Sequence, residues 1–354
     1  MLYGRSQLRM VLATVLMAGI LTGCNDEPNE PATSGGEGGA GLPDGLLLAA
    51  EPAGATGVVA QEQTFSLFDD LSLQHGFRLS AVRSTMKPVE TGSVLVLDPA
   101  QAPNWRLAQW GTRFSLASVE EETLADGTRV LSNAGKTVKV FPGGLGGDGV
   151  LLAVNGGAEY DNALRKQGEP WPHLLVEYCF RTGLFLRDLS ALNFQVEFRI
   201  EQCAPATDKP LASDLHTAQI SAFWTIHNKN RESSDYNDMI WFGVPLFDAR
   251  FDVPQGHQAV DSGKDDATGK FICTIAGERF WSGPVNDGQW HTLACDLLPL
   301  IREALALSQA KDFLTDSAFE DLSPTTFNLG WEVPGPYDCA IHLRALKLEG
   351  TPRE

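Results

Sequence analysis

Apolar and polar residues alternate along many short segments of the chain, which is the pattern of β-strands with one buried face. The alternation is clearest over residues 194–200, 220–227, 327–333 and 338–348, and shorter runs of strand-forming residues cover 93–97, 105–110, 137–141 and 150–154. In the run over 338–348 the apolar positions change phase between Leu343 and Leu346. A change of phase of this kind predicts a β-bulge, because one extra residue moves the following side chains to the other face.

One segment has a helical period instead. Residues 299–310 open with Pro299 and consist of strong helix formers with an apolar stripe. The strands do not alternate regularly with helices, which argues against a parallel α/β sheet. We therefore predict an all-β chain, a jelly-roll β-sandwich of the concanavalin A-like type with one packed α-helix.

Composition narrows the class of protein. Hydrophobic residues make up 43% of the 354 residues and charged residues 20%, which excludes a chain that is disordered throughout. The net charge of −18 argues against a basic surface for nucleic acid, so we expect no nucleic-acid partner. Eight tryptophans indicate that the protein binds something flat.

The N-terminus has the pattern of an export signal. Arg5 and Arg9 precede an apolar run over 11–21, which is too short to span a bilayer and ends in Leu-Thr-Gly-Cys24. This resembles the bacterial lipobox, which implies cleavage after residue 23 and acyl chains on Cys24 that insert into a lipid bilayer. Asn25, which is not Asp, favours the outer membrane over the inner one, so we expect a lipid-anchored protein of the bacterial envelope.

The remaining chain divides into two parts. Residues 24–60 are rich in Gly, Pro, Ala and acidic residues without any period, which predicts a flexible tether. Residues 61–354 contain no internal repeat and no second linker, so we expect one large sandwich domain.

An exported protein can form disulfides. Cys179, Cys203, Cys273 and Cys295 are the candidates, and Cys179/Cys203 and Cys273/Cys295 are plausible pairs if each bridges neighbouring strands. Sequence alone leaves the connectivity open. Cys339 has no partner in these two pairs, and its position on the apolar face of a strand predicts a buried thiol.

Glu332 is the first candidate for chemistry. It lies in a strand that places Trp331 on one face, predicted to be the core, and Glu332 on the other. Gly330 should leave open space beside the carboxylate. A carboxylate in that position suits a general acid or base, and the alternative is a solvated or salt-bridged Glu.

A second candidate segment mixes acidic, amide and aromatic residues. Asp235, Asn237 and Asp238 lead into a strand that carries Trp241 on the face of Asn237. Sugar sites combine flat aromatic rings with amide or carboxylate groups. The alternative is that Trp241 simply packs on its face of the sheet.

These two segments resemble family-12 glycoside hydrolases. The run Tyr-Asn-Asp-Met-Ile-Trp at 236–241 looks like their nucleophile strand, and Gly-Trp-Glu-Val-Pro at 330–334 looks like their acid/base strand. The resemblance implies that Glu332 holds the acid/base position. Asn237 stands where the family has its nucleophile, so hydrolysis would need Asp238 or Asp235 as the second carboxylate.

A third cluster lies in the loop over 160–172 and the strand that follows it. Arg165, Trp171 and His173 fit a loop that borders a ligand site, and we assign them to carbohydrate binding. Arg165 and His173 could also serve a polysaccharide lyase, although no lyase motif is present.

Metal binding is an open alternative. The acidic run 261–266, Asp296 and Asp338 are candidates for a structural calcium, but no EF-hand spacing is present, and no cofactor is predicted with a defined site. Three functions follow from these patterns: a lipoprotein that binds polysaccharide, a glycoside hydrolase or lyase, and a structural envelope lipoprotein.

Overall fold

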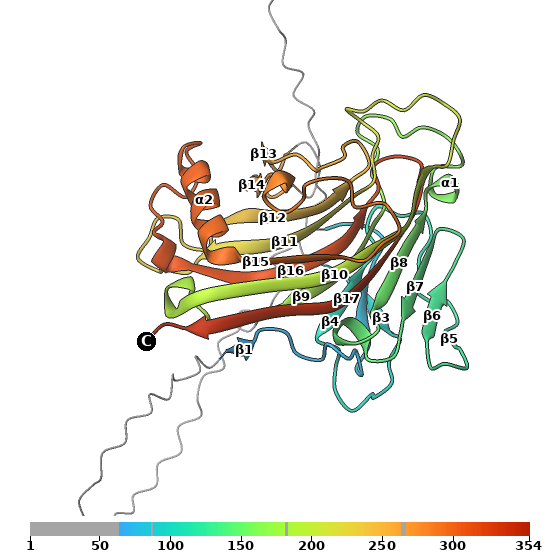
Figure 1. Ribbon diagram of the computed structural model, residues 1–354, viewed down its shortest axis with the longest axis horizontal. Coiled ribbons are helices and arrows are strands. Elements are labelled where there is room, and N and C mark those ends of the chain that lie inside the picture. Colours follow the sequence, from blue (N-terminus) through green and yellow to red (C-terminus); the bar gives the residue numbers. More distant parts are fainter. Residues whose placement is uncertain (1–63, 86–87, 181–182, 263–266) are drawn as a thin grey trace, which may run out of the picture.

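The computed structural model describes residues 64–354 except 86–87, 181–182 and 263–266. The predicted signal over 1–23 and the whole predicted tether over 24–60, Cys24 included, lie outside the described residues. In the described part the strands form two stacked sheets, one of eight and one of nine strands (Figure 1). The predicted all-β jelly-roll sandwich is confirmed.

The eight-stranded sheet contains the longest strands. Its spatial order is β15 (His291–Asp296), β10 (Leu189–Pro205), β17 (Tyr337–Pro352), β8 (Val150–Asn155), β7 (Lys136–Val140), β6 (Arg129–Ser132) and β5 (Glu122–Thr123), with β1 (Phe65–Ser66) also paired to β17. All of its described pairings are antiparallel. The predicted bulge is present in β17, where the register with β10 shifts beside Ala345, a residue at φ 49°.

The nine-stranded sheet carries most of the sequence-predicted chemistry. Its order is β13 (His257–Val260), β14 (Phe271–Thr274), β12 (Met239–Asp248), β11 (Gln219–Asn228), β16 (Leu322–Glu332), β9 (His173–Cys179), β4 (Trp105–Ala108), β2 (Phe77–Ser80) and β3 (Glu90–Val94). β16 and β12 are both antiparallel to β11, so they run in the same direction.

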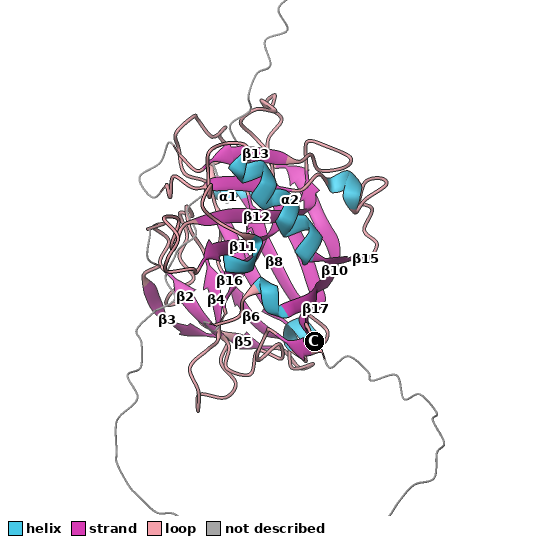
Figure 2. Ribbon diagram, turned by 90° about the vertical axis from the view of Figure 1, so that its left-hand side faces the viewer, coloured by secondary structure: helices cyan, strands magenta, loops and turns pink. Residues whose placement is uncertain are grey.

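Helices are few and short. The predicted helix is α2 (Leu297–Gln309), which starts two residues before Pro299 because the Asp296 side chain caps it by accepting from the Leu298 N–H at 3.0 Å. It packs against β10 of one sheet and β12 and β14 of the other, and so covers one side of the sandwich (Figure 2). The other helical turns are α1 (Gly156–Glu159), η1 (Gly144–Gly146), η2 (Leu186–Asp188), η3 (Gly277–Arg279) and η4 (Phe319–Asp321).

Large aromatic side chains fill the space between the sheets. Phe194 of one sheet meets Trp224 of the other edge-to-face, with ring centroids 4.9 Å apart. Trp105, Trp224, Trp281 and Trp331 all belong to this core. Half of the eight tryptophans therefore stabilise the fold, and the expectation that they mark a ligand surface does not apply to them.

The two disulfide pairings considered from sequence are wrong. Cys179 lies in β9 of the nine-stranded sheet and Cys203 in β10 of the other, and Cys273 and Cys295 are divided between the sheets in the same way. β9 and β10, like β14 and β15, follow each other in sequence but lie in different sheets. Cys203, Cys273, Cys295 and Cys339 are free thiols, so neither pair is formed.

Candidate binding site on the outer face of the nine-stranded sheet

The nine-stranded sheet has a core face and a face turned away from the other sheet, called the outer face from here on. β9 sends Leu174 and Val176 into the core, so His173, Leu175 and Glu177 belong to the outer face. The outer face carries polar side chains at 173 and 177, although both of these residues are buried. Buried polar groups need hydrogen-bond partners. A buried polar atom that has no partner in the protein therefore indicates a candidate site for a ligand.

Glu332 ends β16 on the outer face, between its register partners His173 of β9 and Gln219 of β11. Its Oε2 atom is 3.4 Å from Gln219 Nε2 and 3.6 Å from His173 Nε2. Trp331 points the opposite way and is fully buried, with its indole N–H donating to the Leu152 carbonyl at 3.0 Å. The predicted division of Trp331 and Glu332 between core and outer face is confirmed.

The expected open space beside Glu332 is not there. Gly330 has φ 152°, and a Cβ at this position would collide with the Leu174 carbonyl and the Leu175 backbone of β9. The glycine is thus required by the close approach of two strands. It does not create room for a ligand.

His173 has a defined protonation pattern. Its Nδ1 atom is 3.0 Å from the Trp171 carbonyl, which can only accept, so Nδ1 carries the proton. In the neutral ring, Nε2 then presents a lone pair towards Glu332. Within the described residues Nε2 has no hydrogen-bond partner. A lone pair facing a carboxylate leaves a place for one proton or for a hydroxyl donor.

Two tryptophans border this imidazole. The Trp171 ring stacks on His173 at 5.7 Å and 29°, and the Trp110 ring lies 6.3 Å from His173. The indole N–H of Trp171 is buried and has no partner in the described part of the chain. The group formed by Trp110, Trp171, His173, Gln219 and Glu332 is called the Glu332 cluster below.

Arg165 holds the loop that carries Trp171. Its guanidinium lies over the Trp171 ring at 5.1 Å. It donates to four carbonyls from three segments, at 2.8 Å to Pro334, 3.4 Å to Lys166, 3.1 Å to Glu169 and 2.8 Å to Leu215. Burial lowers the pKa of Arg165. We predicted a ligand contact here, but these donors are used within the protein, so Arg165 positions Trp171.

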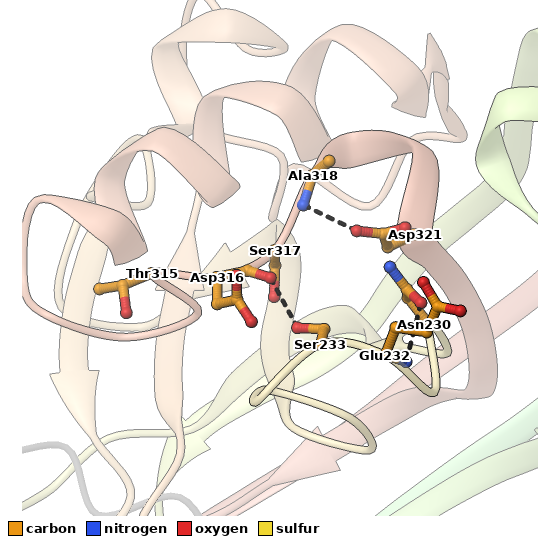
Figure 3. Close-up of a pocket in the computed structure, with 8 residues that line it drawn as sticks. All are labelled: Asn230, Glu232, Ser233, Thr315, Asp316, Ser317, Ala318 and Asp321. Atoms are coloured by element: carbon orange, nitrogen blue, oxygen red, sulfur yellow. Dashed lines mark hydrogen bonds between the residues drawn. The ribbon is translucent and has the colours of Figure 1, made fainter.

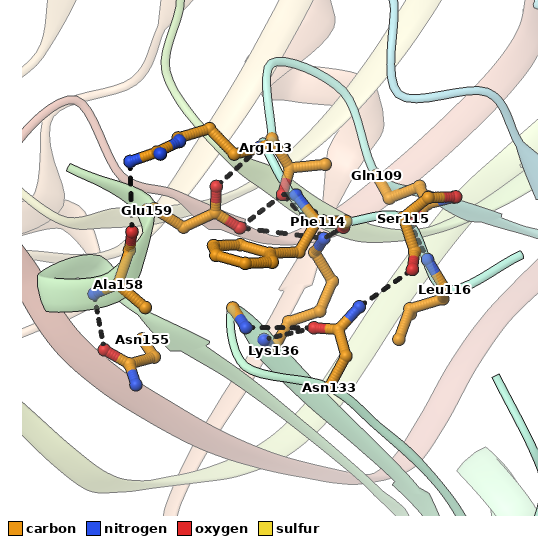
Figure 4. A network of polar contacts seen from close by, with 12 residues as sticks. Gln109, Arg113, Phe114, Ser115, Leu116, Asn133, Lys136, Asn155, Ala158 and Glu159 are labelled. Atoms are coloured by element: carbon orange, nitrogen blue, oxygen red, sulfur yellow. Dashed lines mark hydrogen bonds and ion pairs between the residues drawn. The ribbon is translucent and has the colours of Figure 1, made fainter. Parts of the chain in front are cut away.

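A buried ion pair anchors the loop that follows Trp110 (Figure 4). Lys136 Nζ is 3.7 Å from Glu159 Oε1 and donates to Thr112 Oγ1 at 2.6 Å. Glu159 also accepts from the Thr112 hydroxyl and from the Arg113 N–H. Burial lowers the pKa of Lys136 to about 8, with Glu159 opposing that shift. The network joins β7, α1 and the loop, and thereby supports the Trp110 side of the cluster.

A second polar group lies further along the outer face. Arg106 Nη1 is 3.2 Å from Glu177 Oε2, and both side chains are buried. Burial raises the pKa of Glu177 to about 7, and the charge of Arg106 opposes the shift. Asn328 is the register partner of Glu177, and its Nδ2 has no partner among the described residues.

The segment 235–238 lies at the opposite end of the same sheet. The Asn237 N–H donates to the Asn228 carbonyl, whereas Glu332 is level with Gln219, nine residues earlier on β11. Nine strand residues span about 30 Å. Glycosidase carboxylates lie roughly 5 to 10 Å apart, so Glu332 cannot act with Asp238 or Asp235, and that assignment is wrong.

The acidic and amide side chains of 235–238 serve the local structure. Asp238 pairs with Lys270 at 2.8 Å, and Asn237 accepts from Lys229 at 3.1 Å. Asp235 accepts from the Asp316 N–H and the Ser317 hydroxyl. These contacts account for the three side chains locally, and carbohydrate binding by Asn237 stays a prediction.

An acidic pocket of about 390 Å³ lies beside this segment (Figure 3). Its lining residues are Asn230, Glu232, Ser233, Thr315, Asp316, Ser317, Ala318 and Asp321. Hydrogen bonds from Ser234 and Ser233 hold the pKa of the Asp316 carboxyl below its usual range. The lining contains no aromatic ring, so the pocket lacks the flat surface that a sugar site needs.

Trp241 lies on the outer face, far along the sheet from Glu332, in an apolar cluster that also contains Trp110. It is the register partner of Thr225, which is six residues, about 20 Å, from the level of Gln219. Its indole N–H donates to Thr268 Oγ1 at 3.1 Å, and its ring packs in a small apolar cluster with Phe223. The alternative that Trp241 packs on its face of the sheet is the one that the contacts support.

The carboxylate of Asp248 lies level with Glu332, but it already accepts hydrogen bonds from Arg250 and Thr217. Asp248 is the register partner of Gln219 and shares its face. Both of its oxygens accept from the Arg250 guanidinium, at 2.6 to 3.2 Å, and Oδ1 also accepts from Thr217 at 2.7 Å. This carboxylate is fully occupied by hydrogen bonds.

No calcium site is built by the described residues: they contain no group of three or more His, Cys, Asp or Glu side chains placed to hold a metal ion. Asp296 accepts from the Leu192 and Leu298 N–H groups, and Asp338 from the Gly157 N–H. Residues 263–266 of the acidic run lie outside the described residues. Calcium binding stays a prediction.

Sequence reasoning identified Arg165, Trp171, His173 and Glu332, which the fold brings together. It did not identify Trp110 and Gln219 as site residues. It also did not identify Glu177 and Asn328, which belong to the second polar group on the outer face. Asn328 had a usable signal, because it is a polar residue of the alternating strand 327–333.

No helix in the described part of the chain is both long and apolar enough to cross a membrane. No protein-family model matches this sequence, and no curated protein matches it either.

Solved structures with a similar arrangement are enzymes that act on polysaccharides. The endoglucanase Cel12A from Rhodothermus marinus has a TM-score of 0.34 and 10% identity, covering 66% of this chain and 97% of its own. A family 12 xyloglucanase from Bacillus licheniformis gives 0.34 and 8%, with 66% and 97% covered. The family 11 xylanase from Neocallimastix patriciarum gives 0.33 and 9%, with 66% and 95% covered. Similarity at this level assigns no substrate and no residue role to this chain.

Proposed function

We propose that this protein binds carbohydrate without cleaving it, and that the Glu332 cluster is the binding site. One observation carries the proposal. The stacked Trp171 and His173 rings lie beside the Glu332 carboxylate, and the buried Trp171 Nε1 and His173 Nε2 atoms lack partners within the described residues. Buried polar atoms without a protein partner indicate a place for a ligand or water.

Sugar chemistry fits these groups. A pyranose presents an apolar face that stacks on an aromatic ring, and hydroxyls that both donate and accept hydrogen bonds. A hydroxyl between His173 and Glu332 can donate to either acceptor, and the Trp171 N–H can donate to a sugar oxygen. The Gln219 amide beside Glu332 offers one further polar contact.

The charge of the site favours neutral glycans. Glu332 supplies a carboxylate, and the guanidinium of Arg165, which supports the cluster, already donates to four carbonyls. An anionic sugar would therefore meet repulsion from Glu332 that Arg165 does not offset. We expect stronger retention on neutral glucan, xylan or mannan than on uronic-acid polymers.

Binding is favoured over hydrolysis by the missing second carboxylate. The family-12 type of mechanism needs two carboxyl groups across the sugar. In the described structure Asp235 and Asp238 are about 30 Å from the level of Glu332, and Asp248 is held by Arg250. We expect no release of reducing sugar from the polysaccharides that retain the protein.

Affinity electrophoresis in gels that contain each polysaccharide tests the proposal. Trp171→Ala should weaken retention at least about fivefold, because it removes the indole N–H that would donate to a sugar oxygen, a hydrogen bond that contributes on the order of 1 kcal/mol. Trp290→Ala is the matched control, since Trp290 packs between Arg199 and Arg344 on the eight-stranded sheet. Failure of the unmodified protein to be retained by any polysaccharide would favour a structural envelope role.

We also propose that the chain is an exported lipoprotein of the bacterial envelope, anchored through Cys24 and placed in the outer membrane. The support is the order of Arg5, the apolar run and Leu-Thr-Gly-Cys24 in the sequence. Labelling of cells with a radioactive fatty acid should mark the protein and should not mark Cys24→Ser. Equal labelling of both would reject the anchor.

A further inference from the structure

Cys203 and Cys339 lie directly opposite each other on neighbouring strands of the eight-stranded sheet. Cys203 belongs to β10 and Cys339 to β17, and the two are register partners in an antiparallel pair. Side chains of register partners project from the same face. The pair unites two thiols that are 136 residues apart and that sequence spacing did not connect.

A bulge puts both thiols on the core side. Ile200 and Cys203 are three residues apart, so a regular strand would place them on opposite faces. The register between β10 and β17 shifts between Ile200 and Gln202, which restores the phase. Cys203 therefore packs against the same core as Cys339, half-buried beside a thiol that is only 2% exposed.

The ladder places the pair where side chains come closest. The Ala206 N–H donates to the Pro336 carbonyl at 2.7 Å, one step beyond the end of the paired register. Hydrogen-bonded and non-hydrogen-bonded pairs alternate along an antiparallel ladder, so Cys203 and Cys339 form a non-hydrogen-bonded pair. Their Cα atoms are then about 4.5 Å apart, which lies within the range of about 4.4 to 6.8 Å found for disulfides.

We propose that Cys203 and Cys339 are a modification site that closes to a cross-strand disulfide when a low-molecular-weight disulfide, such as oxidised glutathione, is supplied. The half-buried Cys203 thiolate attacks the glutathione disulfide and releases one glutathione thiol. Cys339 then attacks Cys203 Sγ and releases the second. Two electrons and the two cysteine protons pass to glutathione, which is reduced as the protein is oxidised.

The other free thiols of the described chain lack such a neighbour. Cys273 has Gln258 and Phe242 as register partners. Cys295 has Phe194. Cys295→Ser is therefore a matched control for Cys203→Ser, since both cysteines are half-buried. Burial raises the pKa of Cys203 to about 12, so the reaction should be slow at neutral pH and faster at pH 9.

The experiment incubates the full chain with oxidised glutathione at pH 9, followed by intact mass and peptide mapping without reduction. The expected result is a loss of two hydrogens and a linked peptide pair containing residues 203 and 339. Cys203→Ser should lose this product and Cys295→Ser should keep it. A stable glutathione adduct on Cys203, another linkage of these thiols, or unchanged free thiols in the unmodified protein would overturn the proposal.

Thermal unfolding gives a second readout. The disulfide would close a long loop in the unfolded chain, so oxidation should raise Tm by roughly 5 to 10 °C. Reduction with dithiothreitol should restore the lower Tm, and Cys203→Ser should show no oxidation-dependent change. A linked product with an unchanged or lowered Tm would show that the strands must distort to form it, which contradicts the close pairing of Cys203 with Cys339.

Discussion

The two ends of the outer face contain similar residue types and use them differently. At the Glu332 end, a carboxylate, an amide, an imidazole and two indoles meet in one buried group whose Trp171 and His173 atoms lack protein partners within the described residues. At the Asp238 end, each polar group bonds to a neighbouring loop. Residue type alone therefore does not define a site. What decides is whether the surrounding chain has already satisfied the side chains.

The two segments that resemble the nucleophile and acid/base strands of family-12 glycoside hydrolases lie at these two opposite ends. β12 and β16 run in the same direction on either side of β11. The segment 235–238 precedes the start of β12, and Glu332 ends β16. Strand starts and strand ends of parallel-running strands lie at opposite edges of a sheet, so the two motifs cannot meet.

The largest effect is expected at the Glu332 end from Arg165→Lys. Lysine keeps the charge but cannot donate to carbonyls in three directions, and those buried acceptors lose their partners. We expect the free energy of unfolding to fall by about 3 kcal/mol, measured by urea denaturation. Retention on neutral polysaccharide should fall as well, because Trp171 loses its support. A stability loss below about 1 kcal/mol would contradict the role assigned to Arg165.

An intermediate effect on the free energy of unfolding is expected from a change of pH. It acts through Glu177, which lies on the outer face between the Glu332 end and the Asp238 end. Its pKa rises from an ordinary 4.5 to about 7 on folding, so between these values the folded state binds more protons than the unfolded state. Stability must then fall as pH rises from 4.5 to 7, by on the order of 1 to 3 kcal/mol. Urea unfolding at several pH values measures the slope.

Glu177→Gln is the control for that slope, because the amide retains the shape of the side chain and does not titrate. Subtracting the two stability curves isolates the contribution of Glu177. A difference that is flat, or that rises with pH, would show that Arg106 and not burial sets the pKa of this carboxyl.

The smallest effect is expected at the Asp238 end from Lys270→Ala. The Lys270–Asp238 pair is 2.8 Å long but about a third exposed on both sides. Exposed ion pairs contribute roughly 0 to 1 kcal/mol, and salt weakens them further. The change should be under about 1 kcal/mol and should shrink at high salt. A loss as large as that of Arg165→Lys would remove the contrast between the two ends.

Sequence patterns predicted what depends on neighbours along the chain. The period of two placed Trp331 in the core and Glu332 outside, and the phase change near Leu346 located the bulge at Ala345. The predicted helix begins two residues late, because the Asp296 cap starts the helix at Leu297, ahead of Pro299.

What the sequence could not provide are relations between distant strands. Nothing in the local pattern says that β9 and β10 belong to different sheets, or that Cys203 faces Cys339. The register of one strand against another is set by long-range pairing. The distance between Glu332 and Asp238 could therefore not be predicted from the sequence. Gln219 was missed for the same reason, since only register places it beside Glu332.

The most direct test of the account compares both ends in one binding measurement. Retention of the unmodified protein, Trp171→Ala and Asn237→Ala is measured in gels that contain a neutral polysaccharide. We predict retention for the unmodified protein and for Asn237→Ala, and a loss of at least about fivefold for Trp171→Ala. Retention that is lost in Asn237→Ala and kept in Trp171→Ala would place the site at the other end of the sheet and contradict the account.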